Sequence, residues 1–374
     1  MHERSGSNGG GTALRVVVIP GDGIGPDVVG AARLVLDRIG VEIEWEVHEL
    51  GPGAQDATGS GLPDEMLRAI RECGVALKGP VSTRAGRSGR RSMNVALKRA
   101  LDLDVQVRPC RSRPGVRSLF ADLDLVVIRN TTEDLYAGIE FAAGSTDAAA
   151  LIEVIEQRGG GHIAPESALS IKPVSEGACR RLATFAFDYA RRNHYERVTV
   201  VHKATTMRCT DGLFLEVARE VAAGYDDVAC DDRQVDALCA ELVRRPHAFG
   251  VLMTLNLYGD ILSDLAAALT GGIGLAPGAN FGDHIAVFEA AHGTAPRHAG
   301  KHRADPIAMI LSGALMLRHL GEVAAADTVE AAVDEVLERG EALTYDLLTA
   351  TSEGEAQSTE AVAEAIARAA ARRP

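Results

Sequence analysis

Apolar positions along the chain recur with two periods, which predict short strands separated by amphipathic helices. VEIEWEV (41–47) alternates apolar and charged residues and predicts a strand with one solvated face. Other apolar runs are short and rich in β-branched residues, as buried strands are. These runs are RVVVIP (15–20), LDLVVIR (123–129), RVTVVHK (197–203), FGVLMTL (249–255) and HIAVFEA (284–290).

Helical periodicity follows or separates these runs. It predicts helices at 25–40, 174–192, 212–222, 234–245, 260–269, 305–320 and 328–339. Strands separated by helices predict an α/β fold with a substantially parallel sheet. The segment 138–172 departs from this pattern, because it mixes Gly, Ser and Pro with one short helical stretch. A protruding arm and a linker both remain open for it.

Composition excludes several classes of protein. The 374 residues suffice for two ordinary domains or one large one, and the net charge of −13 disfavours general nucleic-acid binding. No apolar run is long enough for a membrane span. The six cysteines form no CxxC pair, so we expect free thiols and a cytoplasmic location.

One segment, TRAGRSGRRSMN (83–94), concentrates positive charge. Arg84, Arg87, Arg90 and Arg91 lie among small residues and repel one another. The segment suits a nucleic-acid patch, a solvated basic loop or the wall of a pocket for a highly charged anion. The acidic balance of the whole chain weighs against the nucleic-acid interpretation.

The turn IPGDGIGP (19–26) invites a dinucleotide-loop interpretation, but its spacing does not fit. GxGxxG requires a third glycine where Pro26 stands, so the motif predicts a tight strand-to-helix turn rather than a Rossmann fingerprint. A cofactor can still lie over such a turn.

Two aspartates in NLYGDILSDL (256–265) are better candidates for chemistry. Asp260 and Asp264 are four residues apart, so on a helix their carboxylates share one face. A hard divalent cation would offset their mutual repulsion, whereas two solvated surface aspartates are the commoner case for this spacing. The apolar neighbours and the following glycine-rich loop favour a cleft.

Three further segments place reactive side chains after strands. Lys203 ends one predicted strand, and Arg129 and Tyr136 follow another, at positions where open α/β sheets bind ligands. A lysine or tyrosine near a cation can transfer protons. The stretch 288–306 mixes His, Gly and basic residues before a predicted helix start and suits a phosphate-binding loop.

In chain order, these segments resemble the isocitrate/isopropylmalate dehydrogenase family of metal-dependent oxidative decarboxylases, in its isocitrate dehydrogenase-like branch. The resemblance implies an α/β fold that is not a Rossmann fold. Its expected parts are a large domain (1–104 and 271–374), a smaller α/β domain (105–135 and 174–270) and a clasp or arm (136–173). It also implies a homodimer with active sites shared across the interface. The matching segments are IPGDGIGP, SMNVALK, VRPC, LYAGIE, VHKATTMR, NLYGDILSD, HGTAP and LRHLG.

The same resemblance assigns the metal and the proton transfers. It implies that Mg²⁺ or Mn²⁺ is held by Asp260 and Asp264 of one subunit and Asp236 of the other. Lys203, with Asp236, relays the C2 hydroxyl proton as hydride passes to the nicotinamide. Tyr136 protonates C3 after CO₂ is lost, and the cation acts as a Lewis acid.

The resemblance also assigns the substrate contacts. Arg108 and Arg129 bind carboxylates, and Lys98 stands where the family has a third arginine, still cationic but without a bidentate fork. Ser92 and Asn94 supply the Ser-x-Asn element that isocitrate enzymes use for a third acidic group. We therefore expect an isocitrate-like, polyanionic 2-hydroxy-3-carboxy acid, oxidised to a 2-oxo acid.

The basic segment leaves the exact substrate open. Arg84, Arg87 and Arg90 are additional to the usual family pattern, and a phosphonate of the phosphonomethylmalate type, from a natural-product pathway, would suit their charge. Homoisocitrate is a further alternative, and extra arginines on a freely varying loop are equally consistent. A non-catalytic regulatory subunit is a remote alternative, since the catalytic set is intact.

The expected cofactor is NADP, with NAD as the alternative. Arg297 stands where NAD-dependent members carry Asp, and an arginine pairs with a 2′-phosphate. The residues implied at the cofactor are Thr83, His292, Gly293, Thr294, Ala295, Arg297, His298, Asp305 and Tyr345.

Overall fold

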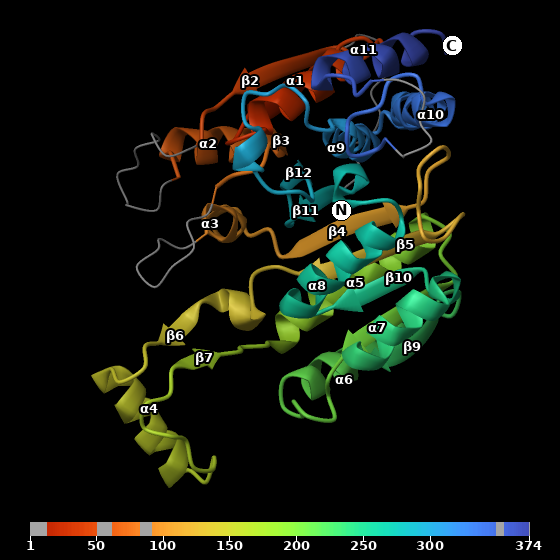
Figure 1. Ribbon diagram of the computed structural model, residues 1–374. Coiled ribbons are helices and arrows are strands. Elements are labelled where there is room, and N and C mark those ends of the chain that lie inside the picture. The colour runs from red at the N-terminus through yellow and green to blue at the C-terminus, as the bar shows by residue number, and fades with distance from the viewer. Residues whose placement is uncertain (1–12, 51–61, 83–91, 349–354, 374) are drawn as a thin grey trace.

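One long sheet runs through the molecule in the computed structural model, which describes residues 13–50, 62–82, 92–348 and 355–373 (Figure 1). Its ten strands lie in the order β2-β1-β3-β12-β11-β4-β5-β10-β8-β9. The strands are β1 (Leu14–Ile19), β2 (Ile43–Val47), β3 (Val75–Lys78), β4 (Val105–Arg111), β5 (Asp124–Asn130), β8 (Arg197–His202), β9 (Ala229–Gln234), β10 (Val251–Thr254), β11 (Pro277–Phe281) and β12 (Ala286–Ala290).

The sheet consists of two parallel halves that run in opposite directions. The pairings within β2-β1-β3-β12 and within β5-β10-β8-β9 are parallel. The three pairings between the halves, β12–β11, β11–β4 and β4–β5, are antiparallel. An odd number of reversals inverts the strand direction, so the substantially parallel sheet predicted from the sequence is confirmed with an antiparallel centre.

Helices cover both faces of the sheet, as the alternation of buried residues requires. In β1, Val16 and Val18 pack into the core with α1 and α9, whereas Val17 and Ile19 pack on the opposite face with α2 and α3. The α-helices are α1 (Gly25–Leu36), α2 (Asp64–Cys73), α3 (Met93–Ala100), α4 (Thr146–Gln157), α5 (Glu176–Arg192), α6 (Asp211–Ala222), α7 (Val235–Arg244), α8 (Asn256–Leu269), α9 (Ile307–His319), α10 (Val323–Arg339) and α11 (Thr359–Ala370).

Two predicted helices begin earlier than expected. Helix α8 starts at Asn256 rather than 260, and α10 starts at Val323 rather than 328. The backbone N–H of Leu257, in the first turn of α8, donates to the side chain of Asp134 at 2.8 Å. Because this acceptor is distant in sequence, the local pattern gives no sign of the helix start.

The two halves of the sheet have separate hydrophobic cores. One core joins β1, β3 and β12 to α1, α9, α10 and α11, and another joins β4, β5, β8 and β10 to α5 and α6 (Figure 1). The domain boundaries at 104/105, 135/136, 173/174 and 270/271 stay predictions. No helix among the described residues is both long and apolar enough to cross a bilayer.

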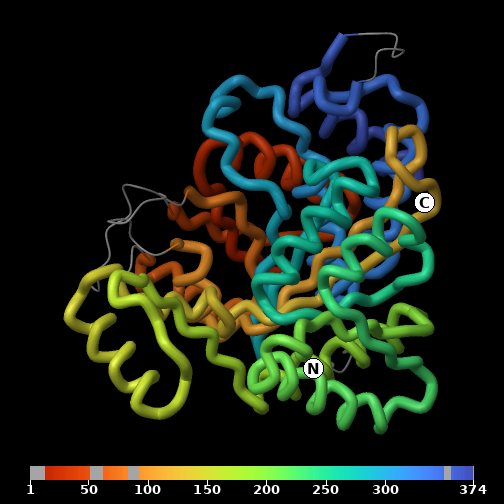
Figure 2. Tube along the Cα trace, turned by 60° about the horizontal axis from the view of Figure 1, so that its bottom comes forward, coloured from red at the N-terminus to blue at the C-terminus, as the bar shows by residue number. Residues whose placement is uncertain are grey.

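Residues 139–171 project from this body. Strands β6 (Ile139–Phe141) and β7 (Leu169–Ile171) form a two-stranded antiparallel sheet of their own, and α4 lies between them. Figures 1 and 2 both show this segment extending away from the main sheet, as an arm would. The linker alternative therefore does not describe it.

Candidate active site

A cavity of about 200 Å³ gathers most of the residues expected to contact substrate. A larger cavity of about 620 Å³ between α5 and α9 contains none of them. We therefore take the smaller cavity as the candidate active site. The predicted residues that line the smaller cavity are Ser92, Asn94, Lys98, Arg108, Arg129, Tyr136, Asp260, His292 and Gly293.

Close packing of α8 on β5 creates the acidic side of this cavity. A Cβ at Gly259 would lie 2.4 Å from the Cβ of Arg129, so only glycine permits this approach. The next residue, Asp260, thereby meets Arg129, which donates at 2.5 Å, and Tyr136, whose O–H also donates at 2.5 Å. One turn further along α8, Asp264 accepts from Arg108 at 3.1 Å.

These contacts set the protonation states of the acid and the phenol. Burial alone would raise the pKa of Asp260, but the charge of Arg129 and the hydrogen bond from Tyr136 outweigh it and lower that pKa. Burial and the Asp260 carboxylate raise the pKa of Tyr136 to about 12. Near neutral pH, the site therefore holds a carboxylate beside a protonated phenol.

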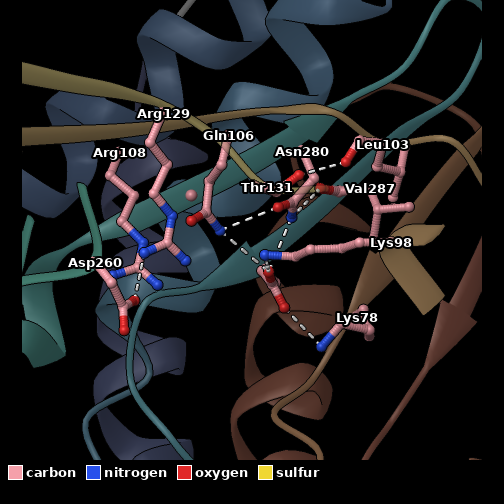
Figure 3. Close-up of polar contacts among 12 residues, drawn as sticks. Lys78, Lys98, Leu103, Gln106, Arg108, Arg129, Thr131, Asp260, Asn280 and Val287 are labelled. Atoms are coloured by element: carbon pink, nitrogen blue, oxygen red, sulfur yellow. Dashed lines mark hydrogen bonds and ion pairs between the residues drawn. The ribbon is translucent and has the colours of Figure 1, made fainter. Parts of the chain in front are cut away.

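A buried ionic network forms the opposite side (Figure 3). Glu289 on β12 lies 2.7 Å from the Lys78 ammonium and 3.5 Å from that of Lys98, and Asn280 donates to it at 2.9 Å. The two lysines lower the pKa of Glu289 despite its burial. Burial, with Arg129, Arg108 and Lys78 nearby, lowers the pKa of Lys98 to about 7, although Glu289 opposes this shift. The sequence interpretation missed Lys78, Glu289 and Asn280.

Buried polar atoms without a protein partner concentrate around the cavity, which indicates a polar ligand. Asn256, also missed from the sequence, contributes one of them. The atoms are Asn94 Oδ1, Arg108 Nε, Arg129 Nε, Asn256 Oδ1 and His292 Nε2.

Lys203 and Asp236 form a separate pair that does not line this cavity. The Lys203 ammonium donates to Asp236 at 2.5 Å and to Gln234 at 3.2 Å. Within the part of the chain that the structure describes, no three His, Cys, Asp or Glu residues are placed to hold a metal ion together. The structure therefore brings Asp260 and Asp264 onto one helix face but leaves Asp236 elsewhere.

Most of the expected cofactor residues lie on the loop 292–298 and at the helix start after it, whereas Tyr345 comes from the segment after α10. Gly23, in the β1–α1 turn, has a φ of +64°, and a Cβ there would lie 2.0 Å from the carbonyl oxygen of Thr294, so the turn packs directly on this loop. His298, in the 3₁₀ helix Pro296–His298, stacks on Tyr345 with ring centroids 5.5 Å apart, and Arg297 beside it is exposed.

Asp305 ends this loop at the start of α9. Its Oδ1 accepts the N–H of Ile307 at 2.9 Å, whereas its buried Oδ2 has no partner. Burial and the nearby Asp346 raise the pKa of Asp305 well above its usual value. Thr83, Arg84, Arg87 and Arg90 lie outside the described residues.

Comparison with known proteins defines the class. The sequence profile of the isocitrate/isopropylmalate dehydrogenase family matches residues 15–366. Because this span covers most of the chain, the protein belongs to the isocitrate/isopropylmalate dehydrogenase family. The predicted family, α/β fold and dehydrogenase class are thereby confirmed.

Individual relatives are similar over most of both chains. The probable mitochondrial isocitrate dehydrogenase (NAD) subunit alpha of Drosophila melanogaster is 40% identical over 333 residues, 89% of this chain and 83% of its own length. The corresponding Homo sapiens subunit is 40% identical over 342 residues, 90% of this chain and 87% of its own length. The crystal structure of isocitrate dehydrogenase from Methylococcus capsulatus superposes with a TM-score of 0.85 at 45% identity, covering 96% of this chain and 99% of that chain.

Proposed function

We propose that this enzyme oxidatively decarboxylates an isocitrate-like 2-hydroxy-3-carboxy acid with a third anionic group. The observation that carries the proposal is the convergence of Lys98, Arg108 and Arg129 on one cavity beside the Tyr136–Asp260 pair. Three cations in a small space select a polyanion, and a protonated phenol next to them can supply a proton.

In this reaction, hydride leaves C2 of the substrate for the nicotinamide and the C2 hydroxyl loses its proton. CO₂ then leaves C3, and C3 gains a proton, which gives a 2-oxo acid. Tyr136 would donate the proton to C3, and its hydrogen bond to Asp260 supports this role. Lys203 and Asp236 are suited to relay the hydroxyl proton, because Asp236 can accept a proton from the ammonium as the lysine nitrogen takes up the hydroxyl proton.

A divalent cation such as Mg²⁺ or Mn²⁺ fits the aspartates of α8, because carboxylate oxygens are its preferred ligands. Asp260 and Asp264 would hold it, with Asp236 of a second copy completing the set that one chain lacks. When bound, the cation supplies Lewis-acid stabilisation of negative charge on the substrate. We propose a homodimer on this ground.

The alternatives differ in the third anionic group of the substrate. Homoisocitrate has a longer arm, and a phosphonate carries more charge, which would suit the arginines at 84, 87 and 90. Those arginines lie outside the described residues, and Ser92, Asn94 and Lys98 support any acidic group equally. A regulatory subunit without activity is disfavoured by the retained Tyr136 and Asp260.

For the cofactor, we propose NADP, with NAD as the alternative that the names of the relatives support. Arg297 is exposed on the loop, and the Arg303 guanidinium lies 5.1 Å from the ring centre of Tyr345. A guanidinium group beside stacked rings, together with an exposed arginine on the same loop, suits a sugar phosphate. Replacement of Arg297 by Asp is expected to raise kcat/KM for NAD relative to kcat/KM for NADP.

We propose that the enzyme works in the cytoplasm, in keeping with cysteines that are all free.

The proposed function is tested with purified protein and Mg²⁺ on isocitrate, homoisocitrate, isopropylmalate and phosphonomethylmalate, each with NAD and NADP. Cofactor reduction and CO₂ release must occur in equal amounts on at least one acid. Reduction without CO₂ release, or no reduction on any of them, would overturn the proposal.

A further inference from the structure

A second group of buried charges lies outside the cavity and has no part in the chemistry above. Asp211 is fully buried, Asp134 is 1% exposed, and Lys172 lies where the arm returns to the body, directly after β7. The Lys172 ammonium is 2.5 Å from Asp211 Oδ1 and 3.8 Å from Asp134 Oδ1, and the Tyr258 ring centre is 5.0 Å away. One lysine therefore forms ion pairs with two buried carboxylates.

Each carboxylate also holds a backbone segment that carries a residue of the proposed reaction. Asp211 Oδ2 accepts the backbone N–H of Lys203 at 2.7 Å. Asp134 Oδ2 accepts the N–H of Leu257, three residues before Asp260, at 2.8 Å. Asp134 itself lies two residues before Tyr136, in the same 3₁₀ helix.

The backbone of Asp134 depends on the arm as well. Its N–H donates to the carbonyl oxygen of Pro173 at 3.0 Å, and its φ of +66° is unusual for a residue with a side chain. A strained residue persists only where its surroundings hold it. The Lys172–Pro173 segment therefore fixes Asp134 through both its side chain and its backbone.

We infer that Lys172 is a positioning residue that holds the Lys203 segment and the Tyr136–Asp260 segment in one arrangement. Loss of the ammonium would leave both buried carboxylates without a counter-charge, so both segments depend on the same side chain. This inference rests on the proposed function, in which Lys203 serves the active site of a second copy while Tyr136 serves its own. Lys172 then links the two active sites of the dimer through each chain.

The test compares hydrogen exchange of the full-length protein, without substrate or metal, in Lys172→Met, Lys172→Arg and a matched control. Arg113→Met is the control, because Arg113 forms an equally short ion pair with Asp334 on α10 through a side chain that is 7% exposed. Lys172→Met is expected to raise exchange by about 10-fold or more both at Lys203 and at Leu257. Lys172→Arg and Arg113→Met are expected to leave exchange at both positions unchanged.

Turnover supplies the second measurement. Lys172→Met is expected to lower kcat by about 10- to 100-fold, the usual effect of losing a residue that orients a reacting group. KM for the acid should change by less than about 3-fold, because the cations of the cavity are untouched. Lys172→Arg should recover most of kcat. Faster exchange confined to residues 139–171, or an unchanged kcat, would show that Lys172 only stabilises the arm.

A second variant covers the case in which Lys172→Met does not fold. Asp211→Asn keeps an acceptor for the Lys203 N–H but removes the charge that Lys172 neutralises. Coupling predicts a changed exchange rate at Leu257, which Asp211 does not hold, because the ammonium is then left to Asp134 alone, and unchanged protection there contradicts it. Exchange needs no turnover, so a wild-type protein inactive on every acid rejects the proposed function alone. An active protein without the exchange pattern rejects only the coupling.

Discussion

The two places that carry reactive groups in this chain differ in how firmly they are held. In the cavity, Arg129 and Asp260 have side chains that are 6% and 39% exposed, and Tyr136 adds a second donor to Asp260. At the other place, the Lys203 and Asp236 side chains are 28% and 66% exposed. The first is organised before any ligand arrives, whereas the second lies open at the surface.

This difference shows what a single chain lacks. An exposed lysine–aspartate pair contributes little free energy and does not by itself fix its own geometry. The hydrogen bond from Lys203 lowers the pKa of Asp236, which keeps it a carboxylate, but among the described residues it belongs to no group of three side chains that could hold a metal ion. In the homodimer that we propose, the α8 face of a second copy would cover this pair and bring Asp260 and Asp264 to it.

The largest expected effect comes from removing one carboxylate at each place. Asp260→Asn and Asp236→Asn are each expected to lower kcat by about 10³-fold or more, because both would lose a cation ligand. Their effects on stability should differ. Asp260→Asn leaves Arg129 buried without its carboxylate and should lower the thermal midpoint by about 2–4 °C. Asp236→Asn should change it by less than about 1 °C.

Steady-state kinetics and calorimetry measure the two effects on the same preparations. Circular dichroism controls for loss of fold. An Asp236→Asn variant that keeps wild-type turnover would contradict its place in the active site, and equal midpoints for the two variants would contradict the difference in burial.

Complementation tests whether the two places meet across a dimer. Lys203→Met and Tyr136→Phe are each expected to be nearly inactive as pure proteins. Random pairing of the two chains makes half of the dimers mixed, and each mixed dimer has one intact site, so the mixture should reach about a quarter of wild-type turnover. Refolding the proteins together and then assaying them measures this. An inactive mixture in which mixed dimers are present would show that both residues act within one chain.

The sequence predicted the charged residues that follow strands, because the ends of strands are where ligands bind in α/β folds. It missed Lys78, the last residue of β3, and Glu289, which lies inside β12. Their role depends on the register that sets Lys78 opposite Glu289 across β3 and β12, and the local pattern contains no trace of this pairing. A charge inside an otherwise buried strand was the available signal.

The separation of Lys203 from the cavity was also beyond local pattern. Lys203 follows β8, which runs parallel to β5 with β10 between them, so Lys203 lies at the same edge of the sheet as Arg129 but two strands away. The ion pairs of Lys172 with Asp134 and Asp211 could not be predicted from the local sequence either, because these residues come from three distant segments. Their sequence contexts are those of ordinary surface residues.

A smaller effect is expected from Lys98, the cation of the cavity with a pKa of about 7. A bound acidic group favours the charged ammonium and raises this pKa. At pH 6 Lys98 is mostly protonated already, whereas at pH 8 it is mostly neutral until substrate binds. Binding should therefore take up almost no proton at pH 6 and about one at pH 8.

Calorimetric titration in two buffers of different ionisation enthalpy measures this uptake at each pH. Lys98→Arg is the control, because its guanidinium stays charged throughout and should abolish the difference. Equal uptake at both pH values in the wild type, or a difference that persists in Lys98→Arg, would show that another group takes up the proton.

The smallest effect concerns Asp305. This carboxyl is buried, but among the described residues it forms no ion pair of the kind that Arg129 forms with Asp260. Because the pKa of Asp305 is raised in the folded protein, ionising it costs stability once the pH exceeds its ordinary value in the unfolded chain, and the cost grows as pH rises towards the folded pKa. Asp305→Asn keeps the acceptor for the Ile307 N–H and removes the charge that Asp346 repels.

The thermal midpoint of Asp305→Asn should rise by about 2–4 °C at pH 8. At pH 3 it should hardly change, because the folded and unfolded carboxyls are then both largely protonated. Asp346→Asn should give part of the same gain, since it removes the repelling charge but not the burial. A gain of equal size at both pH values would show that the substitution stabilises the protein through packing and not by removing a buried charge.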